Sequence, residues 1–495
     1  MLEELRKLLK HASIYGAGNV LGKVVGFLMI PFYTHYLSPA DYGTLELLDL
    51  SLTLVTLVLT MWLNASVVRQ YNDFHEDRDR NQAVSTVLIL AFCIGVVVTI
   101  FGLQFSRPLA AVILNRADLH FYVTLEAWSF LISTVNVVCL SYLRARQRSV
   151  VVVATGLISL TISLLLNIYF IAVRHDGVVG VLYSSIISSI VVTVPLVVYM
   201  LRNVGFSFSY DKLKGLIAFG SPLIITSVAS FAVNFSDRFF LRHFATLSTV
   251  GVYALGYKFG FMLSLLVVQP FDTIWQARIY EIAKRNASGD MFSRLFEYYC
   301  LVLVAAALAL SIIIKEVMTL IASASFHDAY KVVPVVALAY VFQGMNRFVL
   351  AGTYIAKKTM WLAPVGLLTA AANVGLNLLL IPRFGMMGAA WATAFSFLLM
   401  AILSLSVSQK VYRLPYVFGR VAALGSIAII VFSFSTLITV PSLILELSLK
   451  LLLFAAFPIV LYLLGLFSKG EVEQGKTLTQ AILIRSRLLS PAESK

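Results

Sequence analysis

The feature that most constrains this chain is a motif that recurs, far apart, in a sequence built of apolar runs. Leu166-Asn167-Ile168-Tyr169 runs on to Gly177-Val178-Val179-Gly180, and Leu376-Asn377-Leu378-Leu379 runs on to Gly385-Met386-Met387-Gly388. Asn167 and Asn377 lie 210 positions apart, and Ser141-Tyr142 matches Thr353-Tyr354 at a spacing of 212. The nearly constant spacing predicts two homologous halves, and repeats around a central site are common in secondary transporters.

Apolar runs of about 20 residues recur along the whole chain, and each is long enough to cross a bilayer as a helix. Of the 495 residues, 60% are hydrophobic and 13% are charged, which excludes an ordinary soluble protein. We predict an all-α integral membrane protein with about fourteen transmembrane helices. The expected ranges are 13–37, 44–68, 83–106, 119–142, 150–173, 178–201, 216–240, 251–273, 296–320, 332–355, 361–381, 387–408, 417–440 and 443–467.

The basic residues sort between alternate connections of these helices. Clusters such as Arg6/Lys7/Lys10 and Arg144/Arg146/Arg148 fall on one side, so the positive-inside rule predicts that both termini are cytoplasmic. These loops also account for the net charge of +14, and no nucleic acid is expected as a partner. The repeat covers six helices, an even number, so the two halves are expected to insert in the same orientation.

This organisation predicts four parts and leaves no room for a soluble catalytic domain. They are an N-terminal six-helix lobe (1–208), a C-terminal six-helix lobe (209–412), an extra helix pair (413–467) and a cytoplasmic tail (468–495). The sequence has no phosphate-binding loop, zinc-protease motif or nucleophile elbow. Its three cysteines lack metal-ligand spacing. We therefore expect a transporter, not an enzyme, with no cofactor and no metal centre.

The first expected helix carries a lysine near its middle, Lys23, with Asn19 one turn earlier on the same face. A charge at the bilayer centre costs about 2.5–3.5 kcal/mol on insertion scales, so it usually faces a partner or a watery cavity. We favour a cavity lined by Asn19 and Lys23 over a lysine that snorkels to the interface, because Lys23 lies about 15 Å along its helix. A neighbouring stripe of glycines should let another helix approach closely; it comprises Gly18, Gly22 and Gly26.

Two later helices present cations beside aromatic rings. Tyr257 and Lys258 adjoin in the eighth, where Tyr253 shares the face of Tyr257. The tenth carries a polar stripe at helical spacing that consists of Tyr340, Gln343, Arg347 and Tyr354. Such groups could bind a sugar phosphate, since the planar guanidinium matches phosphate oxygens. The alternative, that Arg347 pairs with a carboxylate purely for structure, stays open at this point.

Acidic residues are candidates for coupling to an ion, H⁺ or Na⁺. Asp49 lies near the outer end of the second helix with Glu46, and Asp237 adjoins Arg238 near the outer end of the seventh. Local ion pairing is the alternative for each.

Repeated polar stripes in the two halves favour hydrogen bonding between helices as their main role; they are Thr155/Ser159/Ser163/Asn167 and Thr369/Asn373/Asn377. Gly177/Gly180 and Gly385/Gly388 are expected to shape turns before the next helix.

Short motifs in this chain resemble those of the polysaccharide-biosynthesis, or O-antigen-type, flippases. These belong to the multidrug/oligosaccharidyl-lipid/polysaccharide (MOP) exporter superfamily. The motifs are Tyr15-Gly16-Ala17-Gly18-Asn19, Leu37-Ser38-Pro39-Ala40-Asp41-Tyr42-Gly43 and Tyr253-Ala254-Leu255-Gly256-Tyr257-Lys258. The resemblance implies two lobes in a V shape that alternate access, and a prokaryotic cytoplasmic (inner) membrane location.

The same resemblance implies a substrate, a polyprenyl-diphosphate-linked glycan, and partners, polysaccharide polymerase and glycosyltransferases besides the lipid bilayer. Lys23, Lys258 and Arg347 would then supply cations to the diphosphate. The main rival is an ion-coupled multidrug/cation antiporter of the same superfamily. A glycan polymerase or ligase would need a large outer loop, and a membrane scaffold would not explain cations at membrane depth.

Overall fold

The computed structural model describes residues 2–74, 76–285 and 289–465, and within these ranges the chain forms helices and no β-strand. The first half contains α1 (Leu2–Tyr36), α2 (Pro39–Leu59), α3 (Met61–Asp73), α4 (Asp77–Gln104), α5 (Ser106–Leu114), α6 (His120–Ala145), α7 (Ser149–Asn167) and α8 (Gly177–Val204). The second half contains α9 (Tyr210–Phe244), α10 (Leu247–Leu263), α11 (Gln269–Arg285), α12 (Asp290–Ile321), α13 (Val333–Val349), α14 (Ala351–Ile355), α15 (Leu362–Val411), α16 (Phe418–Leu437) and α17 (Leu443–Leu463).

The predicted all-α membrane fold is confirmed, with differences in how the spans are built. Eleven helical segments among the described residues are long and apolar enough to cross a membrane. One of them, Thr359–Val411, contains two predicted spans, because the chain turns at Gly385 inside α15. The second predicted span is divided into α2 and α3, and α5 is an additional short helix. The number of fourteen spans stays a prediction.

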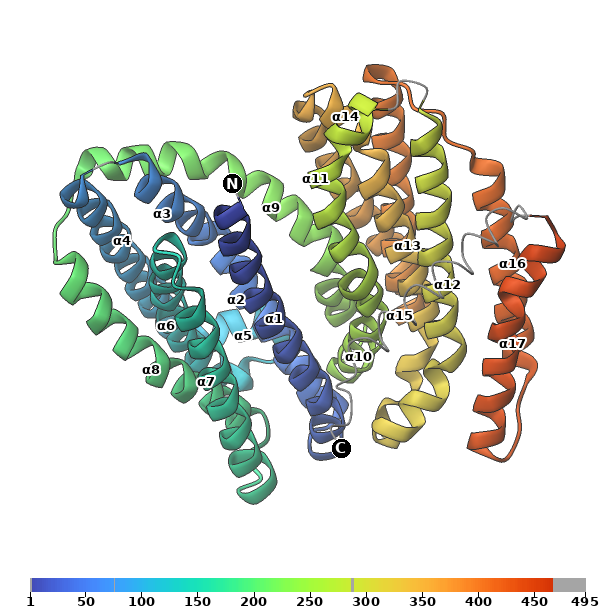
Figure 1. The fold of residues 1–495 in the computed structure, drawn as a ribbon. Helices are drawn as coiled ribbons and strands as arrows, with labels where there is room; N and C mark the ends of the chain where they lie inside the picture. The colour runs from blue at the N-terminus through green and yellow to red at the C-terminus, as the bar shows by residue number, and fades with distance from the viewer. Residues whose placement is uncertain (1, 75, 286–288, 466–495) are drawn as a thin grey trace, which may run out of the picture.

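Figure 1 shows two helical bundles arranged as the arms of a V. One arm contains α1–α8 and the other α10–α15, while α9 runs between them and packs on α15. The helix pair α16 and α17 lies on the flank of the second arm, where both contact α12. The boundaries 1–208, 209–412 and 413–467 stay predictions, and the tail 468–495 lies outside the described residues.

Glycines at repeat-related positions make the turns that precede the last helix of each bundle. Gly177 and Gly385 both have φ of +55°, a left-handed conformation that suits glycine. A Cβ at Gly180 would lie 2.8 Å from the Cβ of Phe170, and one at Gly388 would lie 2.3 Å from the carbonyl oxygen of Leu380. The predicted role of these glycines in the turns is confirmed, and the two halves share their local geometry.

The two arms meet where α2 crosses α10, at the end of the molecule where α1 finishes. Gly43 and Gly251 form this crossing. A Cβ at Gly43 would lie 2.1 Å from the carbonyl oxygen of Leu247, and one at Gly251 would lie 1.9 Å from that of Pro39. Only glycine allows the two backbones to approach this closely.

The two crossing helices also begin in the same way. The Ser38 side chain accepts a hydrogen bond from the Asp41 backbone N–H, and the Thr246 side chain accepts one from that of Thr249. Each cap satisfies an otherwise unpaired amide at a helix start. Ser38 and Thr246 lie 208 positions apart, as do Gly43 and Gly251, so the crossing joins equivalent parts of the repeat.

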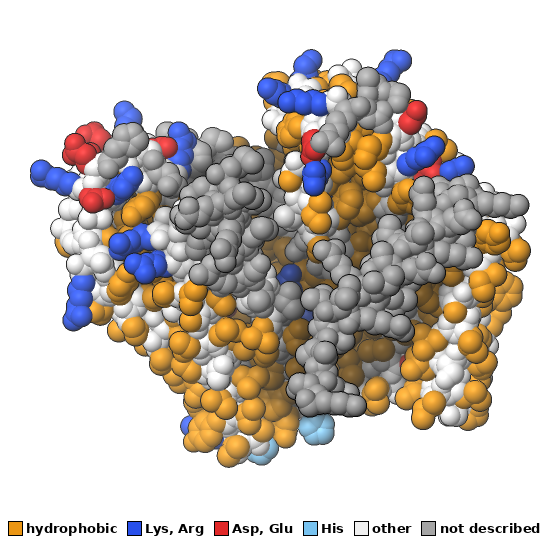
Figure 2. Space-filling view, in the orientation of Figure 1, with side chains coloured by type: hydrophobic (Ala, Val, Ile, Leu, Met, Phe, Trp, Pro, Cys, Tyr) orange, Lys and Arg blue, Asp and Glu red, His pale blue; other side chains and the backbone are white. Residues whose placement is uncertain are grey.

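Charge separates along the direction in which the long helices run. Figure 2 shows Lys and Arg side chains gathered at the end where α1 begins, above sides that are mainly hydrophobic. Apolar sides with a polar end are what a bilayer requires of a protein that crosses it. The cytoplasmic placement of the termini stays a prediction.

Candidate functional site

A cluster of charged side chains lies where α2 of the first arm packs against α10 of the second arm and against α9, which runs between the arms. Glu46, on α2, is its centre. One carboxylate oxygen lies 3.8 Å from Arg238 Nε, and the other lies 3.4 Å from Lys258 Nζ. One acid from the first half thus holds two cations from the second half, and the site exists only because the arms meet.

Arg238 is deeply buried in the cluster, with 2% of its side chain exposed. It donates to Asp237 Oδ1 at 2.7 Å and to the backbone carbonyl of Asn234 at 2.7 Å. Its guanidinium stacks on the Tyr257 ring, 3.7 Å from the centroid, a cation–π contact that strengthens without water. The Tyr257 hydroxyl in turn shares a hydrogen bond of 2.8 Å with that of Tyr340. Arg238 Nε, which faces Glu46, is buried and has no hydrogen-bond partner among the described residues.

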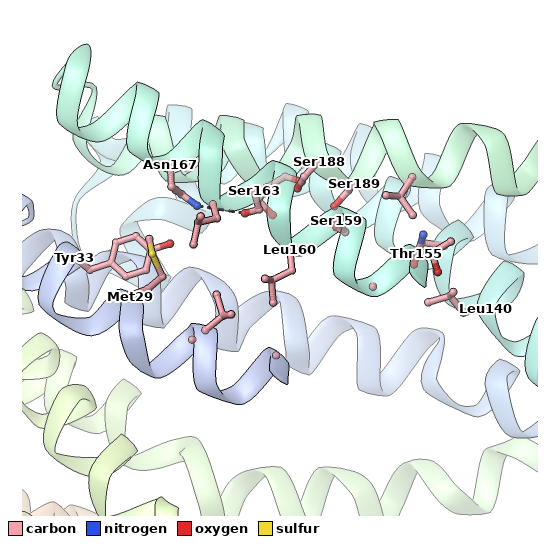
Figure 3. A pocket seen from close by; sticks show the side chains of 18 residues that line it. Met29, Tyr33, Leu140, Thr155, Ser159, Leu160, Ser163, Asn167, Ser188 and Ser189 are labelled. Atoms are coloured by element: carbon pink, nitrogen blue, oxygen red, sulfur yellow. Dashed lines mark hydrogen bonds between the residues drawn. The ribbon is translucent and has the colours of Figure 1, made fainter. Parts of the chain in front are cut away.

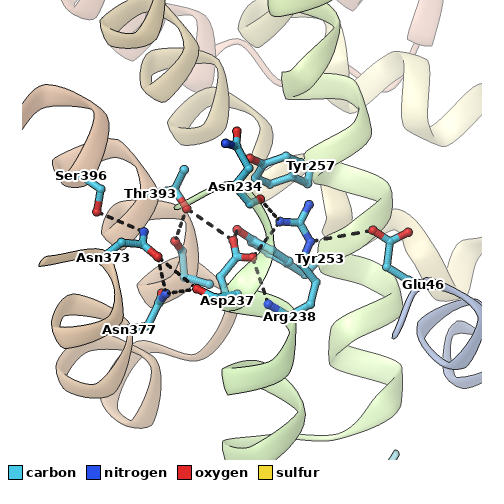
Figure 4. A network of polar contacts seen from close by, with 12 residues as sticks. Glu46, Asn234, Asp237, Arg238, Tyr253, Tyr257, Asn373, Asn377, Thr393 and Ser396 are labelled. Atoms are coloured by element: carbon cyan, nitrogen blue, oxygen red, sulfur yellow. Dashed lines mark hydrogen bonds and ion pairs between the residues drawn. The ribbon is translucent and has the colours of Figure 1, made fainter. Parts of the chain in front are cut away.

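Behind Arg238, the Asp237 carboxylate faces a layer of neutral oxygen and amide groups (Figure 4). Tyr253 donates to Asp237 Oδ2 at 2.5 Å, and Thr393 donates to the same oxygen at 3.4 Å. The polar stripe of α15 continues from there through Asn373 and Asn377.

The α15 stripe is bonded to α9 and buried. Ser236 of α9 donates to Asn373 Oδ1 at 3.1 Å, and the amides of Asn373 and Asn377 bond to each other at 3.0 Å. Asn373 also donates to Ser396 at 3.1 Å. The predicted role of this stripe in hydrogen bonding between helices is confirmed. The Asn377 Oδ1 atom is buried, and the described part of the chain offers it no partner.

Lys258 differs from Arg238 in that it reaches open space. About half of its side chain, 49%, is exposed, and its ammonium donates to the Tyr42 hydroxyl at 2.9 Å. Asp49 interacts electrostatically with Glu46 and Lys258, and Glu126 of α6 interacts with Asp49. A space-filling view shows a hollow between the arms with basic side chains at its depth (Figure 2).

The structure therefore brings four predicted residues to one place: Tyr257, Lys258, Asp237 and Asp49. Lys23 is exposed on α1, with no ion pair to this cluster among the described residues. The side chain of Asn19 lies outside the described part of the structure. Of the glycines beside them, Gly18 does receive a neighbouring helix closely, because its Cβ would lie 2.7 Å from Val153.

The predicted stripe of α13 divides between two environments. Tyr340 is buried against Tyr257, and Gln343 accepts a hydrogen bond from Ser264 at 3.4 Å. Arg347 is exposed, and at 1.5 Å per residue it lies about 10 Å further along the helix than Tyr340. It interacts electrostatically with Tyr299. Arg347 thus stands apart from the Lys258 cluster along the membrane axis.

Sequence reasoning missed the central position of Glu46 and the contact between Asp237 and Thr393. One signal was available: Gly43 and Gly251 occur at the repeat spacing, and a pair of glycines marks a close helix crossing. Glu46 lies three residues after Gly43, and Lys258 lies seven residues after Gly251, so both follow the crossing into the membrane.

The fold, with its eleven apolar segments long enough to cross a bilayer among the described residues, defines a multi-pass membrane protein. Among solved structures, the chain is similar to a lipid II flippase, MurJ, in an inward closed conformation, with a TM-score of 0.73 and 11% identity, covering 92% of this chain and 99% of that one. It is also similar to an inward-facing multidrug resistance MATE family transporter of the MOP superfamily, with a TM-score of 0.62 and 15% identity, covering 81% and 94%.

Sequence comparison identifies the family. The model of the polysaccharide biosynthesis protein family matches residues 34–279, about half of the chain, and the chain belongs to that family. Two proteins of Haemophilus influenzae are related along part of it. The Lsg locus protein 1 is 23% identical over 291 residues, 57% of this chain and 68% of its own length. An uncharacterized membrane protein is 24% identical over 271 residues, 53% of this chain and 62% of its own length.

Proposed function

We propose that this protein moves a polyprenyl-diphosphate-linked glycan from the cytoplasmic to the outer leaflet by alternating access, for assembly of a cell-surface polysaccharide. The observation that carries the proposal is the half-exposed Lys258 ammonium at the junction of the two arms. Its carboxylate partner, Glu46, comes from the opposite arm. A cation in that position can bind an anion, and its pairing with Glu46 depends on the distance between the arms.

A diphosphate suits this site because cations at membrane depth are costly unless they meet an anion. Lys258 offers a point charge that is open to the hollow. Arg238 lies on the buried side of Glu46 and forms an ion pair with its carboxylate. A lipid-linked substrate can keep its polyprenyl chain in the bilayer while the diphosphate reaches the ammonium. Lys23 and Arg347 remain proposed contacts, at other points along the path.

Coupling to an ion follows from the order of charges, which alternates along Asp237, Arg238, Glu46 and Lys258. A cation bound at Asp237 would compete with Arg238 for that carboxylate. Arg238 would then move closer to Glu46, because its Nε lies 3.8 Å from that carboxylate and has no hydrogen-bond partner among the described residues. Glu46 would loosen its hold on Lys258, and the ammonium would become available to the diphosphate.

The surroundings of Asp237 suit a small hard cation, Na⁺ or H⁺. Hard cations are held by oxygen ligands, and Asp237 is accompanied by Thr393 and by Asn377, whose Oδ1 lacks a partner among the described residues. In the same part of the chain no group of three or more His, Cys, Asp or Glu side chains could hold a metal ion, so neutral oxygens would complete the shell. Asp49, near Glu46 and Lys258, is the second proposed coupling residue.

The proposal includes its setting in the cell. The protein would lie in a prokaryotic cytoplasmic membrane with both termini in the cytoplasm, and would hand its substrate from glycosyltransferases inside to a polysaccharide polymerase outside. Nucleic acid has no place in this account, since the basic residues gather at one end of a membrane protein.

An ion-coupled multidrug/cation antiporter is the second candidate, and one observation favours it. A cavity of about 300 Å³ lies among α2, α4, α5 and α6, and the described residues around it are mainly apolar. Glu126 is the single charged residue among them. An acid in apolar surroundings is a site that a lipophilic cation could occupy.

The test compares two lysines that are alike in their surroundings. Lys258 is 49% exposed and lies 3.4 Å from Glu46, and Lys315 of α12 is 44% exposed and lies 3.4 Å from Glu446. In cells deleted for this gene, Lys258→Met should leave lipid-linked glycan in the cytoplasmic leaflet, whereas Lys315→Met should restore export. Normal export by Lys258→Met at wild-type protein levels would overturn the proposal. Unchanged glycan with altered resistance to cationic drugs would favour the antiporter.

A further inference from the structure

A second cavity, of about 470 Å³, is lined by residues of four helices of the first arm, α1, α6, α7 and α8. Figure 3 shows the polar side chains of α7 directed toward it, facing Met29 and Tyr33 of α1. Its polar lining consists of hydroxyl and amide groups, among them Thr155, Ser159, Ser163, Asn167, Ser188 and Asn136. None of the described residues that line it is charged.

The cavity exists because α1 presents glycine where its repeat counterpart, α9, presents side chains. The nearest described atom to a Cβ at Gly22 is a methyl group of Leu160 at 3.9 Å, and a Cβ at Gly26 would have no described neighbour within 4 Å. In the second arm the equivalent polar stripe of α15 is closed by Ser236 of α9. At the repeat spacing of 208, Ser236 corresponds to Leu28, whose side chain cannot hydrogen-bond.

One polar atom at the cavity lacks the hydrogen bond that its burial demands. Asn167 is 4% exposed, and its amide nitrogen donates to Ser163 at 3.3 Å, but its Oδ1 atom has no partner among the residues that the structure describes. A buried acceptor without a donor is unfavourable, so the site favours a ligand that brings a donor. The helix passes into a π-helical segment, Ile168–Val173, directly after Asn167, and such segments are frequent at functional sites.

The chemistry of the lining selects the class of ligand. A cation would need a carboxylate and an anion would need a basic group, and neither occurs among the described lining residues. An uncharged molecule rich in hydroxyl groups can donate to Asn167 Oδ1 and exchange hydrogen bonds with the serine and threonine hydroxyls. The cavity volume lies within the range of about 300–1,000 Å³ that is common for small-molecule sites.

The cavity also adjoins the cationic site. Tyr33 lines it and packs against the apolar cluster that contains Tyr42, whose hydroxyl accepts the hydrogen bond from Lys258 at 2.9 Å. A diphosphate held at Lys258 would therefore carry its attached sugar toward this cavity. We infer that the cavity of the first arm binds a sugar ring of the lipid-linked glycan. This inference rests on the proposed function, which assigns the diphosphate to Lys258.

A matched pair of glycines allows the test. Gly156 lines the cavity and Gly366 is its repeat counterpart 210 positions later; a Cβ at either would have no described neighbour within 4 Å. Gly156→Leu fills the cavity and Gly366→Leu does not. A second variant, Asn167→Leu, removes the unpaired acceptor. Losing an unsatisfied polar atom should leave thermal stability unchanged or raised, so this variant separates ligand binding from a structural role.

The measurement is the binding of two lipids to the purified protein in nanodiscs. One is undecaprenyl diphosphate, and the other is the lipid-linked glycan extracted from the host. The glycan should strengthen binding at least tenfold in wild type and in Gly366→Leu. Gly156→Leu and Asn167→Leu should bind both lipids with equal affinity. That affinity should match the affinity of wild type for undecaprenyl diphosphate. A gain that survives in both cavity variants, or no gain in wild type, overturns the inference while the proposed function stands. If neither lipid binds wild type, the proposed function itself fails.

Discussion

The crossing of α2 and α10 predicts the effect of a single methyl group. In Gly251→Ala, the added Cβ would lie 1.9 Å from the carbonyl oxygen of Pro39, whereas ordinary contact begins near 3.4 Å. The two helices must separate locally by about the difference between these distances. The obstacle is backbone, so no side-chain rotation can relieve it.

The magnitude follows from the cost of overpacking, which is about 1–3 kcal/mol for an added methylene in a packed interior. The contact between Gly43 and Gly251 is made when the arms meet at this end of the molecule, and it is lost when they part. The substitution therefore penalises the closed arrangement and favours the open one by about 5–150-fold. Because the arms would rest open at the predicted outer face, we expect transport to slow markedly.

Double electron–electron resonance measures the distance between two nitroxide labels and therefore detects this shift. The labels are placed at the exposed positions His35 and Ser248, which flank the crossing. Gly251→Ala should add or enlarge a longer-distance population. Gly375→Ala is the control, since a Cβ there meets no described atom within 4 Å. A wild-type distance distribution in a well-folded Gly251→Ala protein would refute the reasoning.

Further predictions concern two groups of ion pairs, one around Asp237 and one around Lys450. Asp237→Asn should abolish the dependence of transport on a Na⁺ or proton gradient, measured in proteoliposomes with imposed gradients, and retained dependence would exclude Asp237 as the coupling group. Lys450 of α17 lies 2.5 Å from Glu316 and 2.8 Å from Glu446, all buried. Lys450→Met leaves the buried Glu316 without its cation and Glu446 with Lys315 as its remaining cation. Breaking a buried pair in this way costs about 3–5 kcal/mol, so thermal unfolding should occur at a lower temperature. An unchanged unfolding temperature would show that the pairing contributes little. The double variant Glu446→Lys/Lys450→Glu should recover only part of the lost stability. Glu316 would then face a carboxylate at position 450, where it now meets the ammonium of Lys450.

The internal repeat made the two-armed fold predictable. Asn167 and Asn377, with the glycines that follow each of them, indicate two similar bundles, and the structure repeats even their turn geometry at Gly177 and Gly385. Hydropathy could not foresee that α2 is divided from α3 or that α5 forms, because such breaks depend on local packing and not on average polarity.

The candidate site was only partly predictable, for a physical reason. Sequence patterns place residues on a helix face but do not say which face meets another helix. Lys258 and Asp237 could be chosen as charges within apolar runs. The centre of the cluster is nevertheless Glu46, because the α2–α10 crossing brings its carboxylate between Arg238 and Lys258.

The cavity of the first arm illustrates the same limit. The stripes ending in Asn167 and Asn377 look equivalent in sequence, and both were predicted to bond helices together. Only the facing helix distinguishes them, since Ser236 closes one stripe and the glycines of α1 leave the other open.

The central claim is that the protein itself moves a lipid-linked glycan through the site at Lys258. The most direct measurement reconstitutes the purified chain in liposomes that contain the extracted lipid-linked glycan, and follows its accessibility to an impermeant oxidant of sugars added outside. With wild type or Lys315→Met, the oxidant should reach the whole glycan pool. With Lys258→Met, it should reach only the outer-leaflet pool, as in protein-free liposomes. Equal and complete access with Lys258→Met, or no access beyond protein-free liposomes with wild type, would contradict the account.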